Sequence, residues 1–233
     1  DGNTIAPVVF TDDRLAGDVF TATSSSSTFA NKNVGTGKAV TVTGVSVVGT
    51  DAANYVVTPS SLSTTGDITA KAATIIAENK SKVYGTADPA LTATTTGLVT
   101  GDTLTGALVR VAGENVGTYD ITAGTITAGA NYTTTFATGT FTIVKADQVI
   151  TISPVSNKNP EDPAFNIVAT TTSGLPITFY LGIGTNVCTL ATSTVTLTGA
   201  TGTCTIVADQ AGNMNYNPAS STSIVINVLD THA

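Results

Sequence analysis

The sequence predicts an all-β protein in which three tandem β-sandwich modules form an extended rod. Charged residues make up only 11% and aromatic residues 6% of the 233 residues, and tryptophan is absent. Thr, Gly, Ala, Ser and Val are common instead, a composition typical of short strands joined by tight turns rather than of helices. Runs that alternate apolar and polar residues recur between glycines, which indicates half-buried strands separated by turns or bulges.

An internal repeat predicts how the chain is divided. The sequence Asn33-Val34-Gly35-Thr36 returns as Asn115-Val116-Gly117-Thr118, and each copy is followed by an apolar strand and then by an Asn-Tyr dipeptide. Self-similarity of this kind outranks other sequence signals for the fold. We therefore define a first segment (residues 1–72), a second segment (73–146), a third segment (147–229) and a tail (230–233). The repeat marks are Asn33, Gly35, Asn54, Tyr55, Asn115, Gly117, Asn131, Tyr132, Asn215 and Tyr216.

The first segment begins with a turn-like sequence, Asp1-Gly2-Asn3-Thr4, at a point where a first strand should just have ended. Period-two alternation is clear in Val40-Thr41-Val42-Thr43. Strands are predicted at residues 6–10, 19–23, 39–48, 55–57 and 67–70.

The second segment follows without a flexible linker. Its predicted strands cover residues 73–76, 82–84, 91–96, 104–111, 118–122, 132–135 and 140–144. The first and second segments end alike, in a strand followed by Lys-Ala, and the spacing between Lys71 and Lys145 gives the repeat length. No Gly/Ser-rich coil separates the segments, so we expect a semi-rigid rod rather than beads on a string.

The third segment has the pattern of an immunoglobulin-like sandwich. Short strands are predicted at residues 149–152, 165–169, 177–181, 187–190, 194–198, 204–208 and 223–228, with turn residues between them. The tail holds the chain's one histidine, and we expect it to be frayed and inert.

The two cysteines predict a disulfide in the third segment. Cys188 is in phase with Leu190 and Cys204 with Ile206, so both thiols should face the same core. In a flat meander their strands would lie about 10 Å apart, whereas a disulfide needs Cα atoms within roughly 7 Å. We expect the two strands to face each other across the sandwich or to converge at its edge. Two buried free thiols are the alternative.

The second segment resembles the MBG module of large bacterial surface proteins, of the type marked by Tyr-Gly. The motifs that carry the resemblance are Lys82-Val83-Tyr84-Gly85, Asp88-Pro89-Ala90, Gly97-Leu98-Val99, Gly101-Asp102 and Gly113-Glu114-Asn115-Val116-Gly117-Thr118-Tyr119. The resemblance implies a repetitive, adhesin-like parent protein on the bacterial outer surface. It implies no catalytic residues.

The flanking segments resemble companion modules. Residues 29–38 with Asp51-Ala52 and Asn54-Tyr55 are similar to the YDG module, and residues 202–206 with 210–216 resemble a bacterial Ig-like repeat. The YDG module is usually entered through a strand ending Lys-Val-Tyr-Asp-Gly, and this sequence begins at the Asp-Gly. We therefore expect the first segment to lack its first strand, which would leave an edge or groove for another chain or a preceding segment to fill. An excised fragment and a subunit polymerised by strand donation both fit this pattern.

Composition and motifs argue against most other functions. A net charge of −7, with Lys and Arg scattered singly, argues against nucleic-acid binding, and no apolar run is long enough for a membrane-spanning helix. We identify no catalytic or metal-ligand motif, expect no enzyme and no cofactor, and leave room for weak Ca²⁺ binding at Asp12-Asp13 or Glu161-Asp162. Lys-Asn isopeptide crosslinks occur in some surface adhesins. Lys82 and Lys38 are the candidates here, but no spacing singles out an acid beside them.

The Asn-Tyr pairs have two interpretations. Tyr55, Tyr132 and Tyr216 could be ligand-stacking platforms. The structural interpretation is favoured, because Asn tolerates a left-handed turn conformation and a Tyr after it can bury its ring while its hydroxyl bonds the backbone, as in a tyrosine corner.

The predicted function is a non-catalytic structural stretch of the stalk of a bacterial surface adhesin or extracellular filament. Its expected partners are neighbouring copies or repeats of the same protein, with host or matrix glycans or proteins bound through other domains. A filament subunit polymerised by β-strand donation into the first segment is one alternative. A carbohydrate- or protein-binding module is another, and it requires an exposed aromatic cluster or a concave polar site.

Overall fold

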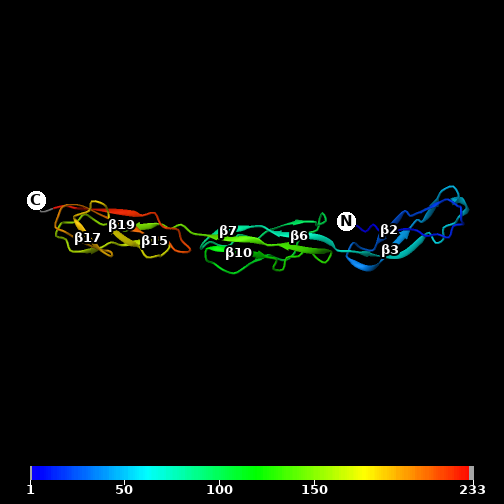
Figure 1. Ribbon diagram of the computed structural model, residues 1–233, viewed down its shortest axis with the longest axis horizontal. Coiled ribbons are helices and arrows are strands. Elements are labelled where there is room, and N and C mark those ends of the chain that lie inside the picture. Colours follow the sequence, from blue (N-terminus) through cyan, green and yellow to red (C-terminus); the bar gives the residue numbers. More distant parts are fainter. Residues whose placement is uncertain (1, 231–233) are drawn as a thin grey trace. The chain divides into compact units, whose positions relative to one another are not determined.

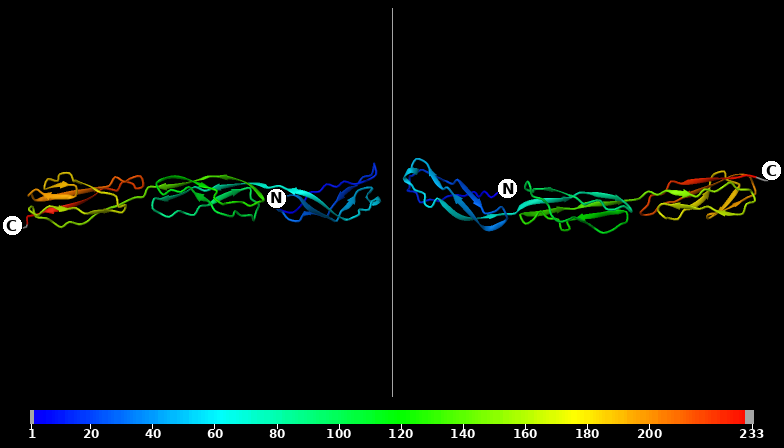
Figure 2. Two further views of the ribbon diagram at one scale, coloured as in Figure 1. Left: turned by 90° about the horizontal axis from the view of Figure 1, so that it is seen from below. Right: turned by 180° about the vertical axis from the view of Figure 1, so that it is seen from behind.

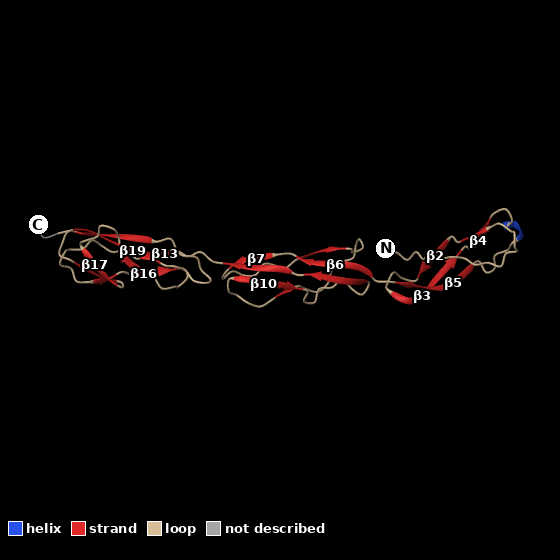
Figure 3. Ribbon diagram, in the orientation of Figure 1, coloured by secondary structure: helices blue, strands red, loops and turns tan. Residues whose placement is uncertain are grey.

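The computed structural model describes residues 2–230 and confirms the all-β class. These residues form twenty strands, and the one helical element among them is a 3-10 turn at Ala52–Asn54 (Figure 3). No helix in this range is both long and apolar enough to cross a bilayer. The chain divides into two compact units. The first contains the residues up to Glu78 with Leu91–Val109 and Ile121–Gly139, and the second contains Asn79–Ala90, Arg110–Asp120 and the rest from Thr140 on. The boundary between the units thus passes through the second segment.

The N-terminal part of the first unit is built on an antiparallel sheet with the strand order β2-β3-β5. Its strands are β2 (Ser26–Phe29), β3 (Gly35–Thr43) and β5 (Ser61–Ile68), and β1 (Thr21–Thr23) pairs with β4 (Ser46–Val48) beside it (Figure 1). The alternation predicted for β3 is confirmed, because Val40 and Val42 are buried together with Ala6 and Val45. The buried members of this core are small side chains, and Phe10 and Phe29 pack against them.

The remainder of the first unit is a three-stranded mixed sheet with the order β11-β6-β8. Its central strand β6 (Lys71–Ala77) runs parallel to β11 (Tyr132–Ala137) and antiparallel to β8 (Ala93–Thr96). Ala73, Ile75 and Ala77 alternate along β6 and are buried, as expected for a strand paired on both edges.

A four-stranded sheet, most of whose residues belong to the second unit, has the order β7-β12-β10-β9. It consists of β7 (Lys80–Val83), β12 (Gly139–Val144), β10 (Gly117–Thr122) and β9 (Val109–Arg110), and β7 runs parallel to β12. Phe141 and Ile143 of β12 are almost completely buried.

The third segment consists of two three-stranded sheets that share one core, with a two-stranded pair beside them. The sheets have the orders β14-β18-β17 and β16-β19-β20, and β13 pairs with β15. The antiparallel pairing of β19 with β20 can be followed in both views of Figure 2 as orange and red ribbons. The bounds are β13 (Ile150–Ile152), β14 (Phe165–Asn166), β15 (Ala169–Thr171), β16 (Thr178–Leu181), β17 (Cys188–Ala191), β18 (Thr194–Leu197), β19 (Gly202–Asp209) and β20 (Thr222–Val228).

A disulfide joins Cys188 to Cys204, with 5.8 Å between their Cα atoms. Cys188 lies on β17 of one sheet and Cys204 on β19 of the other, so the bond crosses the shared core as the phase of the two strands predicted. Both residues are buried beside Val195 and Ile206, and neither described cysteine is a free thiol.

Several of the predicted strands are absent, shorter or divided: 39–48 divides into β3 and β4, and 165–169 divides into β14 and the start of β15. Residues 6–10 and 55–57 form no strand, although both runs are apolar, because neither run has a continuous strand partner. Within residues 2–230, Ala6 alone of these residues bonds a strand, through its N–H to the Ser27 carbonyl of β2. The run 104–111 contracts to β9, since Thr105 makes only an isolated bridge to Thr127 and Gly106 adopts a positive φ of 84° that interrupts extended backbone. Strand propensity alone therefore did not determine which of these residues form strands.

The disulfide should stabilise the third segment specifically. It closes a loop with a sequence separation of 16, for which loop-closure entropy predicts about 3 kcal/mol. We expect the double variant Cys188→Ala/Cys204→Ala, followed by calorimetry, to lose about that much free energy of unfolding in one transition. The other segments contain no cysteine, so their transitions serve as the internal control. An unchanged thermogram would contradict the prediction.

Candidate functional site

The structure brings the repeat marks together in pairs that sequence reasoning did not predict. Asn131 meets Asn33, and Asn215 meets Asn115. In each pair, the Asn of an Asn-Tyr dipeptide in one segment contacts the Asn-Val corner of the segment before it. Gly35 and Gly117, which follow these corners, are the first residues of β3 and β10. We call the two pairs the first junction (Asn33-Val34 with Asn131) and the second junction (Asn115-Val116 with Asn215).

In the first junction, the side-chain amide of Asn131 acts as both acceptor and donor. Its Oδ1 accepts a hydrogen bond from the Val34 backbone N–H at 2.9 Å, and its Nδ2 donates to Asn33 Oδ1 at 3.1 Å. Its backbone carbonyl accepts from the Lys71 N–H at 3.0 Å, where β6 begins. One residue therefore bonds the Asn-Val corner of the first segment and the strand that enters the second.

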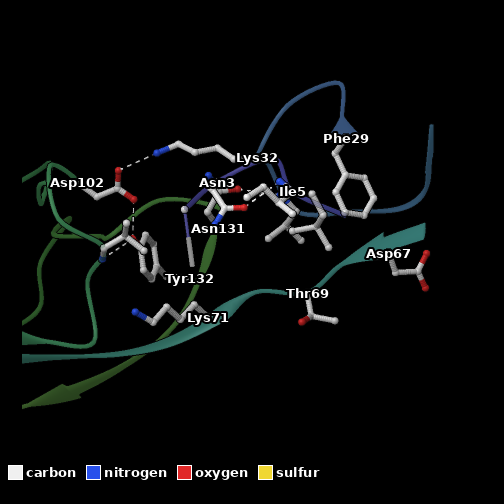
Figure 4. Close-up of a pocket in the computed structure, with 14 residues that line it drawn as sticks. Asn3, Ile5, Phe29, Lys32, Asp67, Thr69, Lys71, Asp102, Asn131 and Tyr132 are labelled. Carbon is white, nitrogen blue, oxygen red and sulfur yellow. Dashed lines mark hydrogen bonds and ion pairs between the residues drawn. The ribbon is translucent and has the colours of Figure 1, made fainter. Parts of the chain in front are cut away.

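Tyr132, the next residue, anchors the same site through its hydroxyl. The hydroxyl accepts from the Val99 N–H at 2.9 Å and donates to Asp102 Oδ2 at 2.5 Å, and Lys32 Nζ lies 3.2 Å from Asp102 Oδ1 (Figure 4). The hydrogen bond from Tyr132, with a smaller contribution from Lys32, lowers the pKa of the Asp102 carboxyl, and the same bond raises the pKa of Tyr132. At neutral pH the Asp102 carboxyl is therefore ionised and the Tyr132 hydroxyl is protonated.

A pocket of about 300 Å³ lies beside the first junction, lined by Lys32, Lys71, Asp102, Asn131 and Tyr132 among others (Figure 4). Tyr132, Asp102 and Lys32 already bond one another there, and the Tyr132 ring is buried, so the ring is not available as a stacking platform. Among the described residues, no three Asp, Glu, His or Cys side chains are grouped to hold a metal ion. Asp12, one of the residues proposed for Ca²⁺, forms an ion pair with Arg14 at 2.6 Å.

The second junction repeats the first with the same atoms. Asn215 Oδ1 accepts from the Val116 N–H at 2.9 Å, and its Nδ2 donates to Asn115 Oδ1 at 3.0 Å. Its carbonyl accepts from the Ala146 N–H at 3.0 Å, as that of Asn131 does from Lys71. Asn215 is only 8% exposed, so this copy is better shielded from water than the first. Tyr216 departs from the pattern, because its ring packs edge-on against Tyr84 at a centroid distance of 5.4 Å.

The Asn54-Tyr55 dipeptide has the tyrosine contacts of the first junction but not its asparagine contacts. The Tyr55 hydroxyl accepts from the Leu15 N–H at 2.9 Å and donates to Asp18 Oδ2 at 2.6 Å, which matches the contacts of Tyr132. Its pKa is raised chiefly by the hydrogen bond to Asp18. Asn54 is exposed, and within residues 2–230 its side chain makes no hydrogen bond.

The reason expected for Asn in these dipeptides is wrong. Thr192 is the sole non-glycine residue with positive φ in the described part of the chain, so neither Asn54, Asn131 nor Asn215 adopts the left-handed conformation. Asn is suitable at the two junctions for a different reason, since its side chain carries a hydrogen-bond acceptor and a donor on one planar group. The hydroxyl contacts expected of the following Tyr are found at Tyr55 and Tyr132.

A second polar cluster within the second unit joins three charged residues of the MBG-like motifs to Arg110. Lys82 Nζ lies 2.7 Å from Asp88 Oδ1 and 2.5 Å from Glu114 Oε2, and Arg110 bonds both carboxylates, with Nε 2.5 Å from Asp88 Oδ2. The Lys82 side chain is 4% exposed, and Arg110 also lies over the Phe141 ring, with its guanidinium carbon 4.8 Å from the centroid. We call these four residues the ion cluster.

The ion cluster disfavours amide bond formation at Lys82. The structure does place acids beside this lysine, as an isopeptide bond requires. However, Arg110 first and Lys82 second lower the pKa of Asp88 from 3.8 to about 2, and Asp88 and Glu114 raise the pKa of Lys82. An ammonium facing a carboxylate is the wrong pair for condensation, because the amine must be neutral to act as a nucleophile.

Comparison with known families supports the resemblances that the sequence shows in the first two segments. Residues 1–64 match the YDG domain, and residues 73–142 match the MBG domain of the YGX type. The curated proteins contain no match to this chain. The matched ranges contain both Asn-Val corners and the first two Asn-Tyr dipeptides, and they suggest a repeat module of a surface protein.

Replacing the junction asparagines should loosen the corners that they bond. We expect Asn131→Ala to destabilise the first unit by about 1–2 kcal/mol, because two side-chain hydrogen bonds are lost, and to speed exchange of the Val34 amide hydrogen. Asn54→Ala is the matched control, and it should change stability by less than about 0.5 kcal/mol. Equal effects of the two substitutions would refute the role given to Asn131.

The same substitution at the second junction should cost more. Asn215→Ala removes the partner of the Val116 N–H and of the Asn115 side chain at a more buried place. We therefore expect the free energy of unfolding of the second unit to fall by about 2 kcal/mol, and the Val116 amide hydrogen to exchange faster. Amide exchange followed by NMR reports both junctions in one sample. Protection of Val116 that survives the substitution would contradict the assignment.

Acid should break the ion pairs of the ion cluster in a defined pH window. Since the folded state lowers the pKa of Asp88 to about 2, its contribution is complete above its ordinary pKa of 3.8 and is lost as the pH falls through about 2. We expect Asp88→Asn to flatten the fall in unfolding temperature over this window. Asp120→Asn, an exposed residue outside the cluster, controls for the change in net charge. Identical acid profiles for the Asp88→Asn variant and the wild type would exclude the cluster as a source of acid lability.

Proposed function

We propose that this chain is a non-catalytic structural stretch of a bacterial cell-surface adhesin or extracellular filament. The observation that carries the proposal is the repeated junction, in which an Asn of one segment bonds the Asn-Val corner of the segment before it by the same two contacts. Repeats joined in this way give a protein whose length follows repeat number and whose stability is a sum over segments and their interfaces.

Two further features support a surface location. The YDG and MBG matches and the disulfide are consistent with a secreted or surface protein, since disulfides persist in oxidising compartments. We extend the proposal to the third segment as a bacterial Ig-like repeat, because its two sheets enclose a core crossed by the disulfide. Neighbouring repeats or copies of the same protein are the proposed partners, and any host or matrix ligand would be bound by other domains.

The proposal requires an extended monomer in solution. Light scattering combined with small-angle X-ray scattering of the full chain should give the monomer mass and the scattering profile of a rod. The double variant Asn131→Ala/Asn215→Ala should keep the mass but broaden the distribution of interatomic distances, because its segments are less constrained. A compact profile for the wild type would rule out the stalk function.

An isopeptide bond at Lys82 would replace its ion pairs by a covalent crosslink, and intact-mass spectrometry detects such a bond. We expect the mass of the sequence less the two hydrogens lost in the disulfide. A further loss of one ammonia molecule, from a crosslink to Asn, or of one water molecule, from a crosslink to Asp or Glu, would show a crosslink at Lys82 if it disappeared in Lys82→Arg, and would contradict the ion-pair assignment.

A further inference from the structure

The strands on which the chain enters the second segment pair directly with the strands on which the chain leaves it. The entering chain forms β6 and then β7, and the leaving chain forms β11 and then β12. Residues 71–76 lie beside residues 132–137, and residues 80–83 lie beside residues 141–144, in parallel register in both cases. The β6–β11 ladder belongs to the first unit and the β7–β12 ladder to the second, and in each the entering and leaving chains run in the same direction.

Hydrogen bonds continue this pairing beyond the two registers. The Tyr84 N–H donates to the Val144 carbonyl at 2.8 Å, one residue after β7 ends. Between the ladders, the Asn79 side-chain oxygen accepts from the Thr140 N–H at 2.8 Å. The entering and leaving chains are therefore bonded to each other at the step between the ladders as well as along them.

Apolar side chains shield both ladders from water on one face. Ala73, Ile75 and Ala77 of β6 are at most 5% exposed, and Phe141 and Ile143 of β12 are at most 1% exposed. A hydrogen bond in such surroundings is electrostatically stronger than one in water. The ladders that join the entering chain to the leaving chain are thus part of the core rather than of the surface.

Tension along the chain pulls the two strands of each ladder in opposite directions along their length. The entering strand is pulled from its N-terminal end and the leaving strand from its C-terminal end. In a parallel pair these two ends lie at opposite ends of the ladder, so the strands are sheared past each other. The bonds of a parallel ladder are evenly spaced, so they share the load and must break together. Peeling the strands apart from one end would instead break the bonds one after another.

The third segment joins its entering and leaving chains much less extensively. Its first strand β13 pairs with β15, and its last strand β20 pairs with β19. Within residues 2–230, its entering chain pairs with its leaving chain in two isolated parallel bridges, Ala146 with Tyr216 and Lys158 with Val228. Two single bridges share a load over fewer bonds than two ladders do, so the second segment should resist tension better than the third.

We propose that the second segment is a mechanical clamp, in which the β6–β11 and β7–β12 ladders keep the segment folded under tension along the chain. The clamp holds the length of this segment constant under loads that open the third segment. It follows from strand pairing alone, and only its use under load rests on the proposed stalk function.

Single-molecule force spectroscopy of the full chain compares the two segments directly. Handles at Thr69, which is exposed, and at the C-terminal end load the second and third segments and leave the first unloaded. The opening event that lengthens when the disulfide is reduced belongs to the third segment, because the bond withholds the residues between Cys188 and Cys204 from extension. At one constant force, we expect the second segment to open at least about tenfold more slowly than the third, since several ladder bonds must break together. A second segment that opens as fast as the third, or faster, would overturn the proposal.

Two proline variants test whether the β6–β11 ladder bears the load. The Lys71 N–H donates to the Asn131 carbonyl, so every second residue of β11 from Asn131 faces β6. The Thr133 N–H therefore belongs to the ladder, whereas that of Thr134 points away from β6 at the edge of the sheet. Thr133→Pro should make the second segment open roughly tenfold faster at constant force, because a loaded bond is lost. Thr134→Pro is the matched control and should open at close to the wild-type rate. Equal rates in the two variants would contradict a load-bearing ladder.

A change of pulling direction tests the clamp without altering either ladder. Handles at Thr69 and Ala130, both exposed, pull β6 and β11 apart from the ends at which both strands begin, so the strands are peeled rather than sheared. The second segment should then open at least about tenfold faster than with handles at Thr69 and the C-terminal end at the same force. Equal rates in the two directions would show that shear is not what holds the segment. Neither result depends on the shape of the whole chain, which scattering tests separately, so failure of the clamp and failure of the stalk function are distinguishable.

Discussion

The backbone N–H of Val34 lies at a corner where strand pairing has not yet begun, and the side chain of Asn131 supplies its hydrogen-bond acceptor. A backbone donor needs a partner from the protein or from water, and the free energy of a lost hydrogen bond is the cost when it has neither. The chain meets this requirement with a residue 97 positions away in the next segment, and it does so again with Asn215 and Val116. A local requirement of the backbone thus becomes a connection between successive segments.

Around these connections, the cores are small and are reinforced by other means. The main cluster of the first segment buries Ala6, Val40, Val42 and Val45, which are small, and Phe20 is buried separately. The third segment adds the disulfide to a larger aliphatic core, and the second unit adds the ion cluster.

The sequence predicted the fold class, the disulfide and the residues of the junctions, but not how those residues pair. Alternation in β3 and the phase of Cys188 and Cys204 are local patterns, so they could be interpreted directly. The pairing of Asn33 with Asn131 could not be predicted in this way. The repeat shows that both dipeptides recur, but it does not show which Asn-Val copy contacts which Asn-Tyr copy. The ion cluster was missed for a related reason. Lys82 and Arg110 come from strands β7 and β9, and Asp88 and Glu114 come from separate loops. The membership of Lys82, Asp88 and Glu114 in the MBG-like motifs was the one available signal.

Relaxation of backbone ¹⁵N nuclei would test most directly whether the first junction joins two segments. The account predicts one rotational correlation time for the amides of β3 and β6 in the wild-type chain, and two different times in Asn131→Ala. If the variant retained a single correlation time, the covalent connection between β5 and β6 would be enough to hold the segments together. The side-chain amide of Asn131 would then have no part in joining them.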